Sequence, residues 1–165
     1  MHVGSSAGGK KESMIRFKDN FNSLDPKLQR MIILENDDKT FNISNTLKLC
    51  ANLHIPLVLD YHHHMCNNTG QKIENYIKRI VNTWDDDIPK MHFSSPKSKK
   101  EKRAHSEYID PKAFITFPEK IKFIDRDIDI MLEAKMKDIA LFKLMDNLRE
   151  NTNYVFVNES TFLLE

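Results

Sequence analysis

The chain has 165 residues, of which 40% are hydrophobic and 30% are charged, and its formal net charge is +1. This composition is typical of a soluble domain, and the length suits one domain. No apolar stretch approaches the roughly 20 residues that a membrane span needs, and the first residues lack the features of a secretory signal. Cys50 and Cys66 are too few for a disulfide framework. We therefore predict reduced thiols and a cytoplasmic location.

The first part of the chain is predicted to alternate strands with amphipathic helices. In order, these elements are a strand end at 1–6, helices at 11–25 and 26–30, a strand at 31–37, a helix at 42–54 and a strand at 55–63. The first helix is indicated by Met14, Phe17 and Phe21 at helical spacing. Ser44 is the expected N-cap of the helix at 42–54.

The second part continues with a helix at 70–84, strands at 88–95 and 127–135, and a helix at 136–150. Between them, residues 94–124 are expected to form a long basic loop without a clean helix. Five cations are crowded at its start, opposed only by Glu101: Lys97, Lys99, Lys100, Lys102 and Arg103. A solvated loop is the simpler interpretation of such a charge run. A long loop at the active face of a fold is more often functional, and clustered cations suit a phosphate backbone.

Alternating elements with continuously apolar strands favour an α/β fold, in which a parallel sheet is covered by helices. A complete (β/α)8 barrel needs about 250 residues, whereas this chain supplies about five parallel strands. We therefore predict that residues 1–165 form one domain, the C-terminal portion of a TIM barrel. Its N-terminal βα units would be missing or would come from a second chain.

Histidines and carboxylates gather where the predicted strands end. The candidates are His2, Glu35, Asp60, His63, His92, His105 and Glu133. Such a set without thiolate ligands suits divalent ions such as Zn²⁺ or Mn²⁺, and two neighbouring ions are a common device for phosphodiester cleavage. Each residue alone is weak evidence, because a strand-end glutamate is equally suited to a helix cap or a salt bridge.

The three consecutive histidines cannot share one role. On an ideal strand, Asp60, His62 and His64 face the same side while His63 faces the other. The strand is expected to end near Asp60, however, and the alternation does not hold beyond that point. Spacing alone therefore leaves the choice among His62, His63 and His64 open.

Six segments together resemble the UV damage endonuclease (UVDE) family, whose members are related to the endonuclease IV-like barrels. In order along the chain, they are "HVGSSAGGK", "LENDDKTF", "IPLVLDYHHHMCN", "PKMHFSSPK", "RAHSEYID" and "DIDIMLEAK". The resemblance implies a TIM barrel with up to three divalent ions, usually manganese, with Zn²⁺ or Mg²⁺ as alternatives. It also implies a DNA repair activity that nicks double-stranded DNA 5′ to UV photoproducts.

The resemblance also implies roles for individual residues. It assigns the metal ligands in three groups, which are His2 with Glu35, Asp60 with His92 and Glu133, and His63 with His105, with Glu35 bridging the first two ions. The catalytic set would be Glu35, Asp60, Glu133 and Lys90. Lys90 matches a lysine that can be carboxylated to an extra acidic ligand, although an ordinary strand lysine is the plain alternative. His62 and His64 would pack or support the ligands. Lys97, Lys99, Lys100 and Arg103 would contact DNA phosphates.

The first strands of the family have no counterpart here. They would supply another histidine to the first ion and the residues that probe the lesion, so we expect the chain alone to be inactive or poorly active. Two other functions are considered. One is a sugar-isomerase-like metal barrel, and the other is a non-catalytic DNA-binding or interaction fragment that pairs with a separate N-terminal chain.

Overall fold

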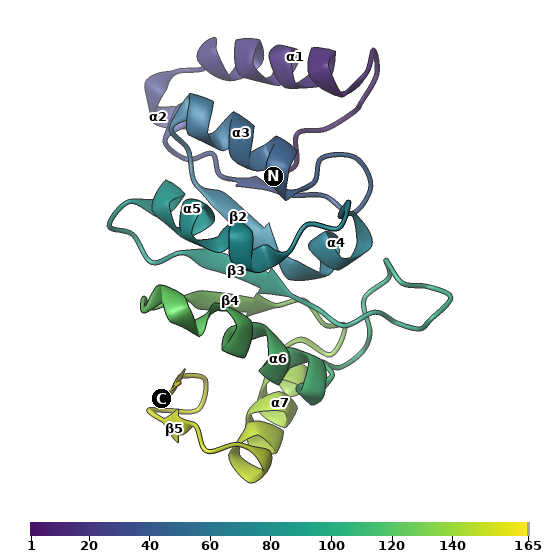
Figure 1. Cartoon of the computed structure of the whole chain (residues 1–165), viewed down its shortest axis with the longest axis vertical. Coiled ribbons are helices and arrows are strands. Elements are labelled where there is room, and N and C mark those ends of the chain that lie inside the picture. The colour runs from purple at the N-terminus through teal and green to yellow at the C-terminus, as the bar shows by residue number, and fades with distance from the viewer. Residues whose placement is uncertain (165) are drawn as a thin grey trace.

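The computed structural model describes residues 1–164, and its centre is a four-stranded sheet in the order β1-β2-β3-β4. The strands are β1 (Leu34–Glu35), β2 (Leu57–Asp60), β3 (Lys90–Phe93) and β4 (Asp129–Leu132). All neighbouring strands are parallel, as the sequence predicts. Each strand lies beside the next one in the chain, so helices fill the crossovers between them (Figure 1).

Seven helices lie in the described part of the chain. They are α1 (Lys10–Asn22), α2 (Pro26–Gln29), α3 (Ile43–Leu53), α4 (Tyr61–Cys66), α5 (Ile77–Val81), α6 (Pro111–Ile121) and α7 (Lys137–Asn151). Short 3₁₀ turns add η1 (Ile73–Asn75), η2 (Asn82–Trp84) and η3 (Lys122–Ile124). An antiparallel hairpin of β5 (Val155–Phe156) and β6 (Phe162–Leu163) follows α7. None of these helices has both the length and the apolar character needed to cross a membrane.

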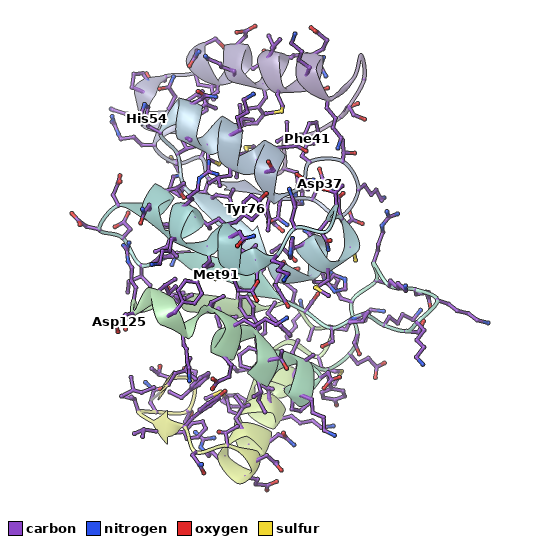
Figure 2. All side chains as sticks on the ribbon, viewed as in Figure 1. Asp37, Phe41, His54, Tyr76, Met91 and Asp125 are labelled. Atoms are coloured by element: carbon purple, nitrogen blue, oxygen red, sulfur yellow. The ribbon has the colours of Figure 1, made fainter. Side chains whose placement is uncertain are left out.

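The two faces of the sheet differ sharply. One face is apolar and buried beneath the helices, with Leu57, Leu59 and Met91 all at 0% exposure. Met91 lies in the middle of the molecule in Figure 2. Side chains alternate across a strand, so Lys90 and its register partner Asp129 lie on the other face, where both are exposed. The helices therefore cover one face, and the open face carries the polar groups.

The start of the chain lies alongside β1. The Met1 amino group donates to the Ile33 carbonyl oxygen at 3.0 Å, and the Glu35 N–H donates to the Met1 carbonyl oxygen at 2.9 Å. This is the hydrogen-bond pattern of a parallel pair, which places His2 next to Glu35. The predicted strand end at 1–6 is thus present at Met1 only, and the following residues lead into α1.

The expectation that no helix lies between His92 and Asp125 is wrong. Only residues 94–110 are irregular, and α6 follows them. The Asp110 carboxylate caps this helix by accepting from two backbone N–H groups of its first turn, at 2.9 and 3.3 Å. Phe114 and Phe117 are buried at helical spacing. Pro118 inside the helix conceals it from sequence reasoning, because proline usually ends a helix.

Other boundaries also differ from the sequence prediction. The strand at 31–37 contracts to β1, and the predicted helix at 70–84 is divided into η1, α5 and η2. The N-cap of α3 is Asn42, whose side chain accepts from the Asn45 N–H at 3.2 Å, rather than Ser44. The β5–β6 hairpin was not expected. Its aromatic residues pack on the helices, as Phe162 does against Phe114.

Candidate metal centre

The carboxyl ends of the parallel strands bring the predicted side chains to one edge of the sheet. Asp60 and His92 are register partners at the ends of β2 and β3, and Glu35 ends β1. Glu133 follows β4, where its N–H still donates to the Phe93 carbonyl oxygen at 2.9 Å. Ligands in open α/β sheets are expected at this edge.

Four side chains form what we call the inner cluster: Glu35, Asp60, His63 and His92. His63 Nδ1 lies 3.1 Å from Glu35 Oε1 and 3.5 Å from Asp60 Oδ2. His92 Nδ1 lies 3.5 Å from Glu35 Oε1 and 3.9 Å from Asp60 Oδ2. Two imidazoles thus face the same two carboxylates, which come from neighbouring strands.

The turn from β2 into α4 brings His63 to this cluster. The Asp60 carboxylate caps α4 by accepting from the His63 N–H at 2.6 Å, so the helix begins directly after the strand. His62 and His64 point elsewhere and are only 4% and 3% exposed. The His62 ring meets His105 edge-on, with ring centroids 5.3 Å apart. Of the three consecutive histidines, His63 is the one whose ring nitrogen lies beside the carboxylates.

Three further predicted residues surround the inner cluster. His2 Nε2 lies 3.9 Å from Glu35 Oε2. On the opposite side, His105 Nδ1 lies 3.6 Å from Glu133 Oε2, and we call these two residues the β4-edge pair. Glu133 Oε1 lies 3.3 Å from His92 Nδ1, which connects this pair to the inner cluster. The structure thus brings all seven predicted metal ligands into one continuous network.

Burial and charge perturb the pKa values of the inner cluster. Burial raises the pKa of Asp60 to about 7, despite the opposing charge of His63. Burial also opposes the charge on Glu35, but the neighbouring His63 and His92 imidazoles hold its pKa well below the usual range. Burial would lower the pKa of His63, yet its contacts with Glu35 and Asp60 raise it to about 9. Positive charge is therefore favoured at the centre of the cluster.

The residues fit a divalent metal ion. Two sets of three ligand atoms lie within 4.8 Å of one another, His2 with Glu35 and His63, and Glu35 with Asp60 and His92. Asp60 Oδ2 and His92 Nδ1 are buried without a hydrogen-bond partner, although such atoms are normally satisfied. A bound cation would satisfy the carboxylate oxygen, and the imidazole nitrogen could ligate it when deprotonated. Carboxylate and imidazole ligands suit Zn²⁺ or Mn²⁺.

The geometry groups His63 differently from the sequence expectation. The resemblance places His63 with His105 on one ion, whereas in the structure His63 lies with His2 and Glu35. The rings of His63 and His105 have centroids 6.4 Å apart. Glu35 belongs to both ligand sets, which is the position expected for a bridging carboxylate.

Lys90 is not brought into the cluster. It lies two residues before His92 on the same strand face, but its Nζ donates to Asp129 Oδ2 at 2.9 Å. Half of its side chain is exposed. A role for Lys90 as a ligand stays a prediction.

The cations between β3 and α6 lie on a protruding hairpin, residues 96–105, which we call the basic hairpin (Figure 1). Two of its cations are already paired. Lys97 Nζ contacts Glu101 at 2.8 Å, and Arg103 Nε contacts Asp38 at 3.4 Å. Lys99, Lys100 and Lys102 form no ion pair with any residue that the structure describes. The hairpin ends at His105, so it is anchored beside the predicted metal ligands.

One residue at the site was missed by sequence reasoning. Asn36 directly follows β1 and is fully buried. Its carbonyl oxygen lies 3.0 Å from His63 Nδ1. The one sequence feature that could have indicated Asn36 is its position inside "LENDDKTF", one of the six segments that carry the family resemblance. An asparagine after a strand is usually interpreted as a turn residue, so its contacts with β2 could not be predicted.

Comparisons with known proteins agree on one family. A family model described as UV-endonuclease UvdE matches residues 1–162. The UV DNA damage endonuclease of Bacillus cereus (strain G9842) is 44% identical over 150 residues, which cover 90% of this chain and 47% of the relative. That of Bacillus anthracis (strain A0248) is 40% identical over 163 residues, covering 98% and 51%.

A solved structure gives the same result. The crystal structure of SacUVDE superimposes with a TM-score of 0.81 at 32% identity, covering 90% of this chain and 50% of that chain. The chain thus spans about half the length of the curated relatives that it matches.

Proposed function

Because the chain belongs to the UV-endonuclease UvdE family, we propose that it is the metal-binding part of a DNA repair endonuclease that nicks DNA 5′ to UV photoproducts. The observation that carries this proposal is the inner cluster. Two ligand sets share Glu35 at the carboxyl edge of the sheet, and buried Asp60 Oδ2 has no hydrogen-bond partner. By family resemblance the ions are manganese, and the same ligands also suit Zn²⁺ or Mg²⁺.

Bound divalent ions would supply Lewis-acid stabilisation of the phosphate and activation of a water molecule. The chain's own residues supply the geometry. Glu35 Oε2 faces His2, and Glu35 Oε1 faces both His63 and His92. Asp60 Oδ2 faces the cluster, and the carboxylate is held rigidly because its Oδ1 caps α4. Glu133 sits beside His92 and is the more exposed carboxylate, so it is suited to the side from which the phosphate enters.

Lys90 has a conditional role in this proposal. A carboxylated Lys90 would add an acidic group on the strand face that carries His92, and it would have to leave its pair with Asp129. Carboxylation removes the positive charge of Lys90, so the electrostatic attraction between Lys90 and Asp129 would be lost as well.

The basic hairpin is proposed to hold the DNA backbone. Lys99 and Lys100 have no ion pair in the described structure, and the pairs of Lys97 and Arg103 are exposed and therefore weak. Contacts of this kind bind phosphates and carry no sequence information. Affinity for duplex DNA should therefore depend strongly on salt.

We further propose that the sheet is the C-terminal portion of a TIM barrel that needs a complementary half. Helices cover one face only, and on the open face Met131 is 59% exposed. Within the described residues, β4 is hydrogen-bonded along one edge, and a groove beside it is lined by Ile130, Leu132 and Leu141. An open apolar strand edge favours association with another segment. The greater length of the relatives supports this interpretation.

Complementation tests this function. The purified chain would be mixed with the half of the Bacillus cereus relative that it does not match, and the mixture given Mn²⁺ and an end-labelled duplex with one UV photoproduct. We expect a nick 5′ to the lesion from the mixture, little or none from either half, and none with Asp60→Asn.

Two controls define the result. Unirradiated duplex should remain intact, and Asp146→Asn, which alters a mostly exposed charge on α7 outside the cluster, should leave nicking in place. A mixture that forms a stable complex without nicking would overturn the proposed function. Specific nicking by the chain alone, lost in Glu133→Ala, would overturn the need for a second half.

A further inference from the structure

Asn36 connects β1 to β2 through its side chain. The residue is 0% exposed and directly follows β1. Its Nδ2 donates to the Asp60 carbonyl oxygen at 2.9 Å, and its Oδ1 accepts from the Asp60 N–H at 3.0 Å. The amide therefore satisfies both backbone groups of a single residue on the neighbouring strand.

This contact continues the sheet where its backbone pairing stops. The β1–β2 register ends at Glu35 and Val58, and the chain then turns into the loop that leads to α3. The Asp37 carboxylate fixes that loop by accepting from the Phe41 N–H at 3.0 Å; both residues are labelled in Figure 2. Without the Asn36 amide, the backbone N–H and carbonyl oxygen of Asp60 would have no hydrogen-bond partner on the β1 side. A primary amide has both a donor and an acceptor, so it can replace a backbone peptide group.

The same residue reaches the histidine of the inner cluster. The Asn36 carbonyl oxygen lies 3.0 Å from His63 Nδ1, and the peptide bond before Asn36 joins it to Glu35. One buried residue thus contacts Asp60 and His63 and is covalently bonded to Glu35. These three side chains come from three different elements, so their separations depend on a connection of this kind.

We propose that Asn36 is a positioning residue that fixes Glu35, Asp60 and His63 relative to one another for metal binding. In this role Asn36 would act through the proposed ligands Asp60 and His63, which it contacts directly. This inference rests on the proposed function, because it assumes that the inner cluster binds a metal. Mutation of residues that orient metal ligands typically costs about 10- to 100-fold in metal affinity.

A purely structural role would look different, and the other end of β2 offers a matched control. There the Leu57 N–H donates to Thr83 Oγ1 at 2.9 Å, so a side chain again replaces a backbone partner of β2. Thr83 lies at the amino end of the strand, away from the cluster. Thr83→Val should therefore weaken the strand without moving the ligands.

The first measurement is Mn²⁺ affinity, followed by the electron paramagnetic resonance signal of free Mn²⁺ at a temperature where all variants are folded. We expect Asn36→Ala to weaken binding about 10- to 100-fold. Thr83→Val should stay within about threefold of the wild type. Unchanged affinity in Asn36→Ala, or an equal loss in Thr83→Val, would overturn the proposal. If Asn36→Ala does not fold, Asn36→Ser is judged by the same criterion.

The second measurement needs no metal. Amide hydrogen exchange of the metal-free chain should be at least tenfold faster at Asp60 in Asn36→Ala, with Leu57 unchanged. Thr83→Val should show the opposite pattern. If the wild-type chain binds no Mn²⁺, the metal centre of the proposed function is refuted. Amide exchange at Asp60 and Leu57 would then be the measurement that decides whether Asn36 holds Asp60 in place. Unchanged exchange at Asp60 would overturn that role.

Discussion

The inner cluster and the β4-edge pair carry the same types of side chain, but the fold holds them differently. In the inner cluster, side-chain exposure ranges from 0% for Asp60 to 18% for His92. In the β4-edge pair it is 31% for His105 and 29% for Glu133. Asp60 and His92 lie on strands with a neighbour on each side, whereas β4 has a described neighbour on one side only.

The difference shows how the sheet would prepare the proposed metal site. Pairing on both sides of a strand, together with the helix cap at Asp60, holds the side chains of the inner cluster in place without a bound ion. The β4-edge pair has a strand on one side and the end of the basic hairpin on the other, so its geometry is less constrained. Affinity should therefore reside mainly in the inner cluster, with the β4-edge pair adding to it.

The largest expected effect comes from removing a charge inside the inner cluster. Asp60→Asn keeps the oxygen that caps α4 but loses the negative charge. Mn²⁺ affinity should fall by at least about 100-fold, or about 2.8 kcal/mol. Thermal unfolding of the metal-free variant at pH 8 should occur at a higher temperature than in the wild type, because a buried carboxylate with a pKa of about 7 is ionised there. Unaltered Mn²⁺ affinity in Asp60→Asn would contradict the assignment.

A smaller effect is expected at the β4-edge pair. Glu133→Ala should weaken Mn²⁺ binding by about tenfold, or about 1.4 kcal/mol, because Glu133 contacts His92 but is partly solvated. His105→Ala should give a similar or smaller change in the same titration. A loss in Glu133→Ala as large as that in Asp60→Asn would remove the distinction between the two groups.

The stability of the metal-free chain should fall as pH rises from 5 to 9. The folded-state pKa values of Asp60 and His63 are raised to about 7 and about 9, so the folded chain binds more protons than the unfolded chain in this range. That stabilisation is complete below the unfolded-state pKa values and is lost as pH rises through the folded-state values. The lowered pKa of Glu35 acts in the opposite direction, but below about pH 5.

Urea unfolding at several pH values would measure this change, which we expect to be on the order of a few kcal/mol across the range. Asp60→Asn should flatten the curve between pH 5 and 7. Glu133→Gln removes a charge that raises the pKa of both Asp60 and His92, so it should flatten the curve to a smaller extent. If the free energy of unfolding instead increased from pH 5 to 9, the raised pKa values assigned to Asp60 and His63 would be contradicted. Mn²⁺ affinity should rise with pH, because binding displaces these protons.

The smallest expected effect concerns the basic hairpin. Replacing Lys99 and Lys100 by alanine should reduce the slope of log K for duplex DNA against log salt by about 1.8, since each contacted phosphate contributes about 0.9. Replacing Lys97 and Arg103, whose charges are already paired with Glu101 and Asp38, should change it less. Fluorescence anisotropy from 50 to 200 mM salt would measure both slopes. Equal slopes in all variants would mean that the basic hairpin does not touch DNA.

Much of the fold could be predicted because the strands are short apolar runs that end in polar residues. The end of β2 at Asp60 follows from such a run. The helix α4 could not be predicted, because three histidines carry no apolar periodicity and its stability comes from the Asp60 cap. The helix α6 was hidden by Pro118, which is tolerated where the buried faces of Phe114 and Phe117 hold the helix in place.

The candidate site could be predicted in composition but not in its internal grouping. Strand ends predict that Glu35, Asp60 and His92 meet, since parallel strands share one edge. The proximity of His63 to His2 depends on the turn of α4 and on Met1 pairing beside β1, which are tertiary effects. The role of Asn36 depends on the spacing between β1 and β2, which the residue's own type does not reveal.

The central claim is that the carboxyl edge of the sheet is a divalent metal centre built around Glu35. Anomalous diffraction at the manganese absorption edge, from crystals of the chain grown with Mn²⁺, tests it most directly. We expect a peak within coordination distance of Glu35, Asp60 and His92, absent in crystals of Asp60→Asn. No peak at this edge, or a peak bound only by residues outside the inner cluster, would contradict the account.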